Sequence, residues 1–192
     1  KIFAAKSFGT DSSLDAIASA RNRGVIGVAS PGVPSPFRSR SFDLVTAFDV
    51  VEHIEDDAAF LREIFRVLSP GGLVLIHVPA HQFLFSYWDR IHGHYRRYSI
   101  QTMTALFEGT GFRVLDAHYA HILPLLPAVA LRAVRSLRYS KSEPESGVSE
   151  HYVLPRPLND ICRGIYDLEA FARRWINLPL GLSLIAVGER PK

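Results

Sequence analysis

Short apolar runs alternate with amphipathic segments along much of the chain. Residues 42–48 are rich in aromatic and β-branched side chains and predict a strand. Residues 57–68 carry apolar side chains at helical spacing, and acidic residues at their start favour the positive end of a helix. The Ser-Pro-Gly-Gly sequence at 69–72 predicts the end of that helix. A nearly continuous apolar run at 73–78 then predicts a strand that is covered on both faces.

The same alternation continues on both sides of these segments. Residues 99–108 predict a helix that is capped by its first serine and ended by glycines, and residues 112–119 predict another strand. Upstream, residues 7–11 predict a short strand that ends in a carboxylate, and residues 12–23 predict a helix. Strands and helices in this order indicate an α/β fold with right-handed crossovers and a parallel sheet.

The alternation breaks in the last third of the chain. Residues 122–179 contain proline-rich joints and helical patterns at about 128–138 and 158–176, and we interpret them as a helical insertion. Residues 182–187 return as a final strand.

Length and composition limit the chain to one domain with one insertion. Its 192 residues are 47% hydrophobic and 21% charged, enough to bury one core but not two large domains. We assign residues 1–121 and 180–192 to this core. Cys162 is the single cysteine, which excludes an internal disulfide and suits a reducing compartment. With no signal or transit sequence at its start, the chain is expected in the cytoplasm.

Charge weighs against nucleic acid as a partner. The net charge is +3, carried by eighteen arginines against four lysines, without a lysine-rich patch or aromatic residues interleaved with basic ones. Three of the arginines recur at helical spacing in the insertion, at 132, 135 and 138. Such a helix could lie on anionic lipid at the inner membrane face or cover an apolar acceptor as a lid. The favoured alternative is a helix packed on the sheet with its arginines in water.

Asp11 stands at the expected end of the first strand. A carboxylate at that place can accept hydrogen bonds from both hydroxyls of a ribose. The alternative, of equal weight on this residue alone, is that Asp11 caps the helix that follows.

Three segments, taken together at their spacings, resemble the class I S-adenosylmethionine-dependent methyltransferases. They are Phe-Asp-Leu-Val at 42–45, Asp-Val-Val-Glu-His-Ile at 49–54 and Leu-Ser-Pro-Gly-Gly at 68–72. The resemblance covers about residues 7–121 and resumes at the last strand. Bacterial methyltransferases with a Gly-His-Tyr-Arg-Arg-Tyr stretch, here at 93–98, are the most similar. The resemblance implies a Rossmann-like, mostly parallel sheet with an antiparallel last strand. It also implies methyl transfer to a small-molecule or lipid-linked acceptor.

The resemblance also implies which residues bind the cofactor, S-adenosylmethionine. Asp11, followed by Ser12, would bind the ribose, and residues 48–53 would lie beside the methionine part. Ser30 stands near the position of an acidic residue that often contacts the adenine amine in this family. The implied cofactor-binding residues are Asp11, Ser12, Ser30, Phe48, Asp49, Val50 and His53.

Two departures from the family pattern bear on cofactor binding. The glycine-rich loop of the family should precede Asp11 by about twenty residues, but only ten residues stand there. No Asp or Glu occurs between Ala16 and Phe42, so the adenine-binding acid is absent. Because the chain also begins without Met, we expect that Lys1 is not the natural start and that a first strand and its glycine loop are missing. We therefore expect this chain to bind the cofactor more weakly than micromolar.

Seven of the eight histidines lie between positions 53 and 121, on the acceptor side of the expected site. Methyl transfer from a sulfonium requires an aligned acceptor and, for a weak nucleophile, a base that takes its proton. We predict His94 as this base, with His53 and His81 as further candidates. For His53, an equal alternative is a hydrogen bond to backbone at the start of a helix. His77 is interpreted as a core histidine with satisfied hydrogen bonds.

Arginine and tyrosine side chains flank the predicted base. Arg96 or Arg97 could hold a phosphate or carboxylate on the acceptor in a forked hydrogen bond, with Tyr95 and Tyr98 lining the same site. The alternative is that the two arginines are a solvated helix entry and that Tyr98 packs against the helix as a hydrophobic staple.

A metal site and two other functions are alternatives to this assignment. Asp49, Glu52 and His53 have the spacing of metal ligands, but a site needs further ligands, from His81 or His94, that no spacing supplies, so we expect no metal. One rival function is a degraded relative that keeps the sheet as a non-catalytic binding module. The other is an RNA methyltransferase, which would bind RNA in a salt-dependent manner.

Overall fold

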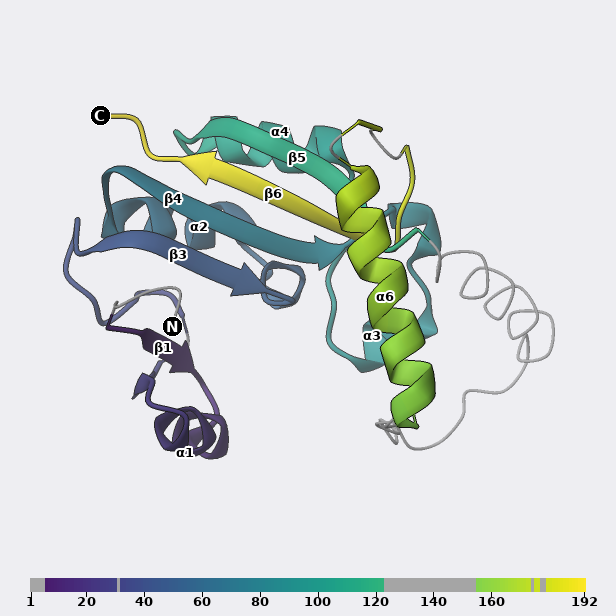
Figure 1. The fold of residues 1–192 in the computed structure, drawn as a ribbon. Helices are drawn as coiled ribbons and strands as arrows, with labels where there is room; N and C mark the ends of the chain where they lie inside the picture. Colours follow the sequence, from purple (N-terminus) through teal and green to yellow (C-terminus); the bar gives the residue numbers. More distant parts are fainter. Residues whose placement is uncertain (1–5, 31, 123–154, 174, 177–178) are drawn as a thin grey trace.

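The computed structural model describes residues 6–30, 32–122, 155–173, 175–176 and 179–192 (Figure 1). Strands alternate with α-helices and two short 3₁₀ helices, η1 and η2. In chain order these are β1 Phe8–Asp11, α1 Leu14–Asn22, β2 Ile26–Ala29, β3 Phe42–Phe48, η1 Val51–His53, α2 Asp57–Val67, β4 Leu68–Pro79, η2 Gln82–Leu84, α3 Tyr87–Ile91, α4 Ile100–Gly109, β5 Arg113–Ala120, α6 Arg156–Ala172 and β6 Ser183–Glu189.

Four strands form the central sheet in the order β3-β4-β6-β5. Strands β3 and β4 pair in parallel, and β6 is antiparallel to both β4 and β5. Strand β5 therefore runs in the same direction as β3 and β4. The expected mostly parallel sheet with an antiparallel last strand is confirmed, and the carboxyl ends of β3, β4 and β5 lie at one edge.

Helices α2 and α4 cover one face of this sheet (Figure 1). Alternate residues of β4 point to that face and are fully buried, together with apolar side chains of both helices. The buried members of this core include Val74, Ile76, Val78, Leu61, Ile64, Met103 and Phe107. The other face of β4 carries Leu73, Leu75 and His77, which are only half-buried within the described part of the chain.

The Ser-Pro-Gly-Gly sequence belongs to β4 rather than to a separate loop. Phe42 pairs with Leu68 but Leu44 pairs with Leu73, so the extra residues of β4 form a bulge. Gly71 adopts a left-handed conformation in the bulge, with φ 80°. Helix α2 ends just before it at Val67, and the Arg190 guanidinium donates hydrogen bonds to the backbone carbonyls at this helix end, at 2.9 Å for Leu68.

Strands β1 and β2 form a separate two-stranded parallel sheet, covered by α1. The described strands thus lie in two sheets, and β2 was not predicted. Among the described residues, aromatic rings connect this unit to the central sheet. Phe8, Phe37 and Phe42 pack edge to face, with ring centroids 4.9–5.9 Å apart. These contacts bring the amino-terminal ends of β1 and β3 together.

Helix α6 lies at the carboxyl end of β5. The Glu169 carboxylate accepts hydrogen bonds from the backbone of His121 and Ile122, and Arg173 forms an ion pair with Asp116 at 3.3 Å. Tyr166 packs its ring against His121. The helix begins and ends slightly earlier than expected. None of the described helices is long and apolar enough to span a membrane.

The other helix expected in the insertion, at about 128–138 with its three arginines, lies outside the described residues.

Candidate functional site

The predicted site residues gather at the carboxyl ends of the parallel strands, where open α/β sheets bind ligands. Asp49 directly follows β3 and has a left-handed backbone, with φ 51°, that turns the chain into η1. Its backbone nitrogen donates to the carbonyl of His77 on β4 at 2.9 Å. His81 follows β4, and His121 follows β5. Three residues that follow three different strands thus share one edge of the sheet.

The Asp11 carboxylate is exposed at the carboxyl end of β1. One oxygen accepts a hydrogen bond from the Ser13 nitrogen at 2.8 Å, and Ser13 itself caps α1. The alternative in which Asp11 is the helix cap is therefore wrong. Ser30 lies next to Asp11, because its nitrogen donates to the Asp11 carbonyl at 3.0 Å. An exposed carboxylate in this position fits the hydroxyls of a ribose.

Exposed apolar surface follows β3. Phe48 is 54% exposed and Val50 36% exposed, which is unusual for side chains of this kind at the end of a core strand. The Asp49 carboxylate between them is bonded to His77 Nδ1 at 3.0 Å. Together with Asp11, these residues offer the polar and apolar surfaces that a nucleoside cofactor needs, so the residues present fit S-adenosylmethionine.

His77 differs from the expected core histidine. Its Nδ1 is occupied by Asp49, but its Nε2 is buried and has no hydrogen-bond partner within the described part of the chain. The His77 ring packs edge to face on Phe48 and His121, with ring centroids 6.4 and 5.7 Å away.

Asp89 organises the loop that precedes α4. It closes a capping box with Ser86 at the start of α3, accepting a hydrogen bond from the Ser86 nitrogen at 2.8 Å. The same carboxylate accepts from Arg97 Nε at 2.7 Å and from His94 Nδ1 at 3.1 Å. These ion pairs hold the pKa of Asp89 below its usual range despite its burial. Sequence reasoning missed Asp89, although Ser-x-x-Asp at 86–89 is a recognisable helix-start signal.

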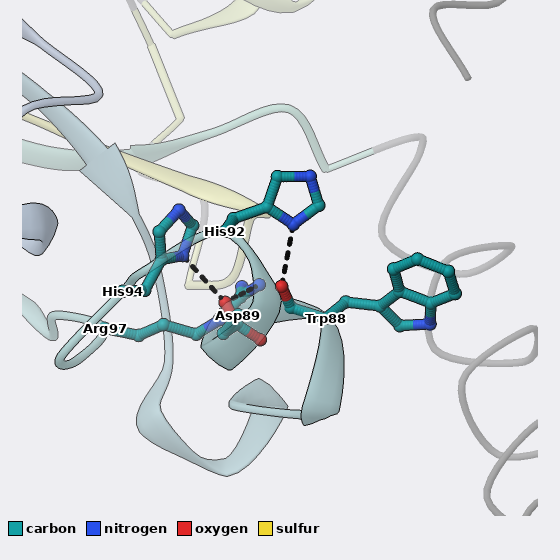
Figure 2. A pocket seen from close by; sticks show the side chains of 5 residues that line it. All are labelled: Trp88, Asp89, His92, His94 and Arg97. Carbon is teal, nitrogen blue, oxygen red and sulfur yellow. Dashed lines mark hydrogen bonds and ion pairs between the residues drawn. The ribbon is translucent and has the colours of Figure 1, made fainter. Parts of the chain in front are cut away.

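Side chains around Asp89 line a hollow of about 240 Å³ (Figure 2). His94 and Arg97 point toward Asp89 from one side, and His92 Nδ1 is bonded to the Trp88 carbonyl at 2.7 Å. Figure 2 shows that the Trp88 side chain extends away from the carboxylate. The hollow therefore has two histidine rings and a compensated charge pair on its walls.

Both arginines predicted to bind an acceptor are engaged by groups of this chain. Arg97 is buried in its ion pair with Asp89. Arg96 pairs with Asp57 at 2.7 Å and also donates to the Glu55 carbonyl. The binding of an acceptor by these arginines stays a prediction. The alternative, in which both arginines lie in solvent at the start of the helix, is wrong for Arg97 because its side chain is buried.

The two tyrosines of this stretch are in different environments. Tyr98 is buried in the core, and its hydroxyl donates to the Asp57 carboxylate at 2.8 Å. Burial and this hydrogen bond raise the pKa of Tyr98 far above its ordinary value. Tyr95 is half-exposed, so Tyr95 is the one of the two whose ring is open to a ligand.

The three candidate bases are not all brought together. His53 and His94 are in contact, with ring centroids 4.6 Å apart and planes at 83°. Burial lowers the pKa of His94, so its ring is neutral near pH 7. His81 instead packs between Tyr119 and Phe83, with centroids at 4.4 and 5.2 Å. Burial and the nearby Arg97 charge lower the pKa of His81 as well.

Glu52 is a titratable group that sequence reasoning considered only for metal spacing. Its side chain is 1% exposed, and burial raises its pKa to about 7. The sequence does not indicate that Glu52 is buried. Glu52 lies in the short 3₁₀ helix η1, where no helical or strand periodicity tells which side chain points inward.

The chain matches a family model described as "Methyltransferase domain" over residues 3–117. This stretch contains Asp11, the residues after β3 and the loop around Asp89. The chain therefore belongs to the class I S-adenosylmethionine-dependent methyltransferase family, as the sequence motifs indicated.

Individual relatives agree with this family. A probable S-adenosylmethionine-dependent methyltransferase of Mycolicibacterium smegmatis is 37% identical over 83 residues, which are 42% of this chain and 32% of the relative. A demethylmenaquinone methyltransferase of Corynebacterium kroppenstedtii is 40% identical over 68 residues, 35% of this chain and 30% of the relative. The aligned segments thus take in less than a third of either relative.

Solved structures of methyltransferases have a similar fold. A chain in the solved complex between the Haloferax volcanii Trm112 methyltransferase activator and the putative methyltransferase superposes with a TM-score of 0.62. The superposition covers 96% of this chain and 72% of that chain, at 19% identity. At this identity the likeness establishes the Rossmann-like methyltransferase fold.

Proposed function

We propose that the protein transfers the methyl group of S-adenosylmethionine to a small-molecule or lipid-linked acceptor. The observation that supports this most is the family match, which spans both the cofactor-side and the acceptor-side residues at the carboxyl edge of the sheets.

The cofactor side consists of residues after β1, β2 and β3. Asp11 and Ser12 bind the ribose, Ser30 lies toward the adenine, and the exposed Phe48 and Val50 lie along the methionine part. The bound cofactor supplies an electrophilic methyl group. These residues orient it and keep one side of it away from water.

The acceptor side is the loop around Asp89. His94 donates a hydrogen bond from Nδ1 to Asp89. Its other ring nitrogen, Nε2, is therefore the atom that can take a proton from an acceptor. The lowered pKa of His94 keeps this nitrogen unprotonated near pH 7. Because the charge of Arg97 is already balanced, the site favours a neutral acceptor over a strongly anionic one.

Apolar side chains support a lipid-linked acceptor. Phe48, Phe83 and Tyr95 are each more than half exposed near the carboxyl ends of β3 and β4. One relative carries the name demethylmenaquinone methyltransferase, and an acceptor with a long apolar tail would suit these rings.

A mass-gain screen tests this function. The protein is incubated with S-adenosylmethionine and pools of small molecules, bacterial lipids or RNA, and products heavier by one methylene unit are sought. Asp11→Asn should lower transfer by about tenfold or more, because it weakens a charge-assisted pair of hydrogen bonds. Asp15→Asn, at an exposed position on α1, is the matched control.

The pools separate the rival functions. Methylation confined to the RNA pool would favour the RNA methyltransferase. Cofactor binding without a product in any pool would favour the non-catalytic binding module and would contradict the proposal.

A further inference from the structure

Three side chains with metal-binding atoms meet where the loop before α4 lies over η1. A carboxylate oxygen of Glu52 and one ring nitrogen each of His53 and His94 all lie within 4.8 Å of one another. The Tyr95 nitrogen donates to the Glu52 carbonyl at 2.8 Å, which fixes the loop against η1. The three groups are therefore held together by the fold although His94 is far from the other two in sequence.

One carboxyl oxygen of Glu52 lacks a hydrogen-bond partner within the described residues. This oxygen is Oε2, and the Glu52 side chain is almost completely buried. A buried carboxyl oxygen left in this way is costly to the folded state and calls for an explanation. A cation bound at this oxygen would supply the missing interaction.

His94 is oriented in the manner of a metal ligand. Its Nδ1 donates to Asp89, which is itself fixed by Arg97 and by the Ser86 nitrogen. Histidines that bind metals commonly donate the other ring nitrogen to a carboxylate, which sets the tautomer and the direction of the ring. The hydrogen bond drawn in Figure 2 thus leaves Nε2 of His94 as the ligand atom.

The charges around the cluster favour a cation. Asp49 and Arg97 are the charged groups that act on Glu52, and His53, Asp89 and Arg97 are the titratable or charged groups that act on His94. The positive charge of Arg97 is balanced by Asp89 at 2.7 Å. The carboxylate of Asp49 beside Glu52 then adds a negative charge that favours a cation.

We infer that Glu52, His53 and His94 bind a divalent first-row transition metal ion such as Zn²⁺. Two imidazoles with one carboxylate suit zinc and its neighbours, whereas Mg²⁺ and Ca²⁺ prefer oxygen ligands. At ligand distances of about 2.0–2.2 Å, tetrahedral ligand atoms lie about 3.3–3.6 Å apart, so side chains whose ligand atoms are now up to 4.8 Å apart must close by about 1 Å on binding. His53 is exposed, so one side of the ion faces solvent. The sequence alone led to the opposite expectation because it could not bring His94 to Glu52.

Titration calorimetry with ZnCl₂ on chelator-treated protein tests this site. The wild-type chain should bind one ion with a dissociation constant in the micromolar range or below. Glu52→Gln and His94→Gln should each weaken binding at least tenfold. His92→Gln is the matched control, since His92 lies two residues away in the same loop and bonds to the Trp88 carbonyl, and it should bind as the wild type does.

Two results would overturn the inference: no stoichiometric binding by the wild type, or equal weakening by His92→Gln and His94→Gln. A second measurement does not depend on how the variants fold. X-ray absorption of the zinc-loaded wild type should show nitrogen and oxygen ligands with the outer-shell scattering of two imidazoles. A spectrum without imidazole scattering would contradict the assignment. An ion bound at His94 Nε2 would replace the proton-accepting role proposed for that nitrogen, so the two roles exclude each other. Neither readout requires methyl transfer, so the metal site can fail while the proposed function stands.

Discussion

The β1–α1–β2 unit and the segment from Ser86 to Tyr98 both carry residues proposed to bind ligands, but different interactions hold them in place. In the first, Ile17 is the one side chain of α1 that is buried, and aromatic contacts of Phe8 lead to the central sheet. In the second, Asp89 and Arg97 are buried and joined by charge-assisted hydrogen bonds. Asp11, Ser12 and Ser30 thus lie at a loosely attached unit, whereas the acceptor-side residues lie on a tightly bonded segment.

This difference bears on how the site works. A side chain held by several charged hydrogen bonds needs little reordering when a ligand binds, whereas an exposed one on a small sheet must be ordered at that time. His94 therefore belongs to the prearranged half of the site, and Asp11 to the half that a ligand would stabilise.

Replacing Asp89 should have the largest effect. Asp89→Asn removes the charge that balances buried Arg97 and should lower the free energy of unfolding by about 3–5 kcal/mol. Urea unfolding followed by circular dichroism measures it. Asp15→Asn, on the loosely attached unit, should change it by less than about 0.5 kcal/mol. A loss below about 1 kcal/mol for Asp89→Asn would show that the tightly bonded segment does not depend on this ion pair.

Shortening Phe37 should have a smaller and local effect. Phe37→Ala removes two edge-to-face contacts, each contributing about 0.5–1.5 kcal/mol, and should loosen the β1–α1–β2 unit. Hydrogen exchange should quicken across residues 8–29 and stay unchanged across 86–98. Phe37→Leu, which keeps most of the apolar volume, should fall in between. Equal acceleration in both regions would mean that they are not held independently.

The smallest expected effect is a change in pH dependence at His81. Because burial lowers the pKa of His81 in the folded protein, the unfolded chain binds more protons below the ordinary histidine value of about 6.5. This residue therefore removes stability as pH falls from 7 to 5. His81→Asn tolerates the left-handed backbone at this position, with φ 62°, and should reduce that loss.

Urea unfolding at pH 7 and pH 5 measures the effect, with His92→Asn as the control for loss of a histidine from the same region. An unchanged pH dependence in His81→Asn would contradict the environment described for the ring.

The elements that could be predicted are those with a local signal. Strand β3 and helix α2 follow directly from apolar spacing and flanking acidic residues, and their predicted bounds agree with the structure to within a residue. The separate pairing of β1 with β2 could not be predicted, because strand pairing is a non-local choice that four-residue strands specify weakly. The bulge of β4 could not be predicted for a related reason, because the register of a strand depends on its partner strand.

The candidate site also has a part that could be predicted from the sequence and a part that could not. The positions of Asp11 and Asp49 at strand ends follow from the order of elements. The contact of His94 with Glu52 and the capture of Arg97 by Asp89 depend on how the loop before α4 folds back over η1. That path is set by the packing of Tyr98, by the backbone hydrogen bond from Tyr95 to Glu52 and by the bonds of Arg96 to Asp57 and Glu55, for which the sequence carries no periodic signal.

Calorimetry with S-adenosylhomocysteine tests most directly whether these strand ends form a methyltransferase cofactor site. The measurement uses the 192-residue chain beside any longer form that the natural gene encodes, each with and without Asp11→Asn. We predict one molecule bound in the micromolar range by a form that carries a glycine-rich loop, weaker binding by the 192-residue chain, and at least tenfold weaker binding by Asp11→Asn. An absence of binding by every form, or Asp11→Asn binding as tightly as the wild type, would contradict the proposed cofactor site.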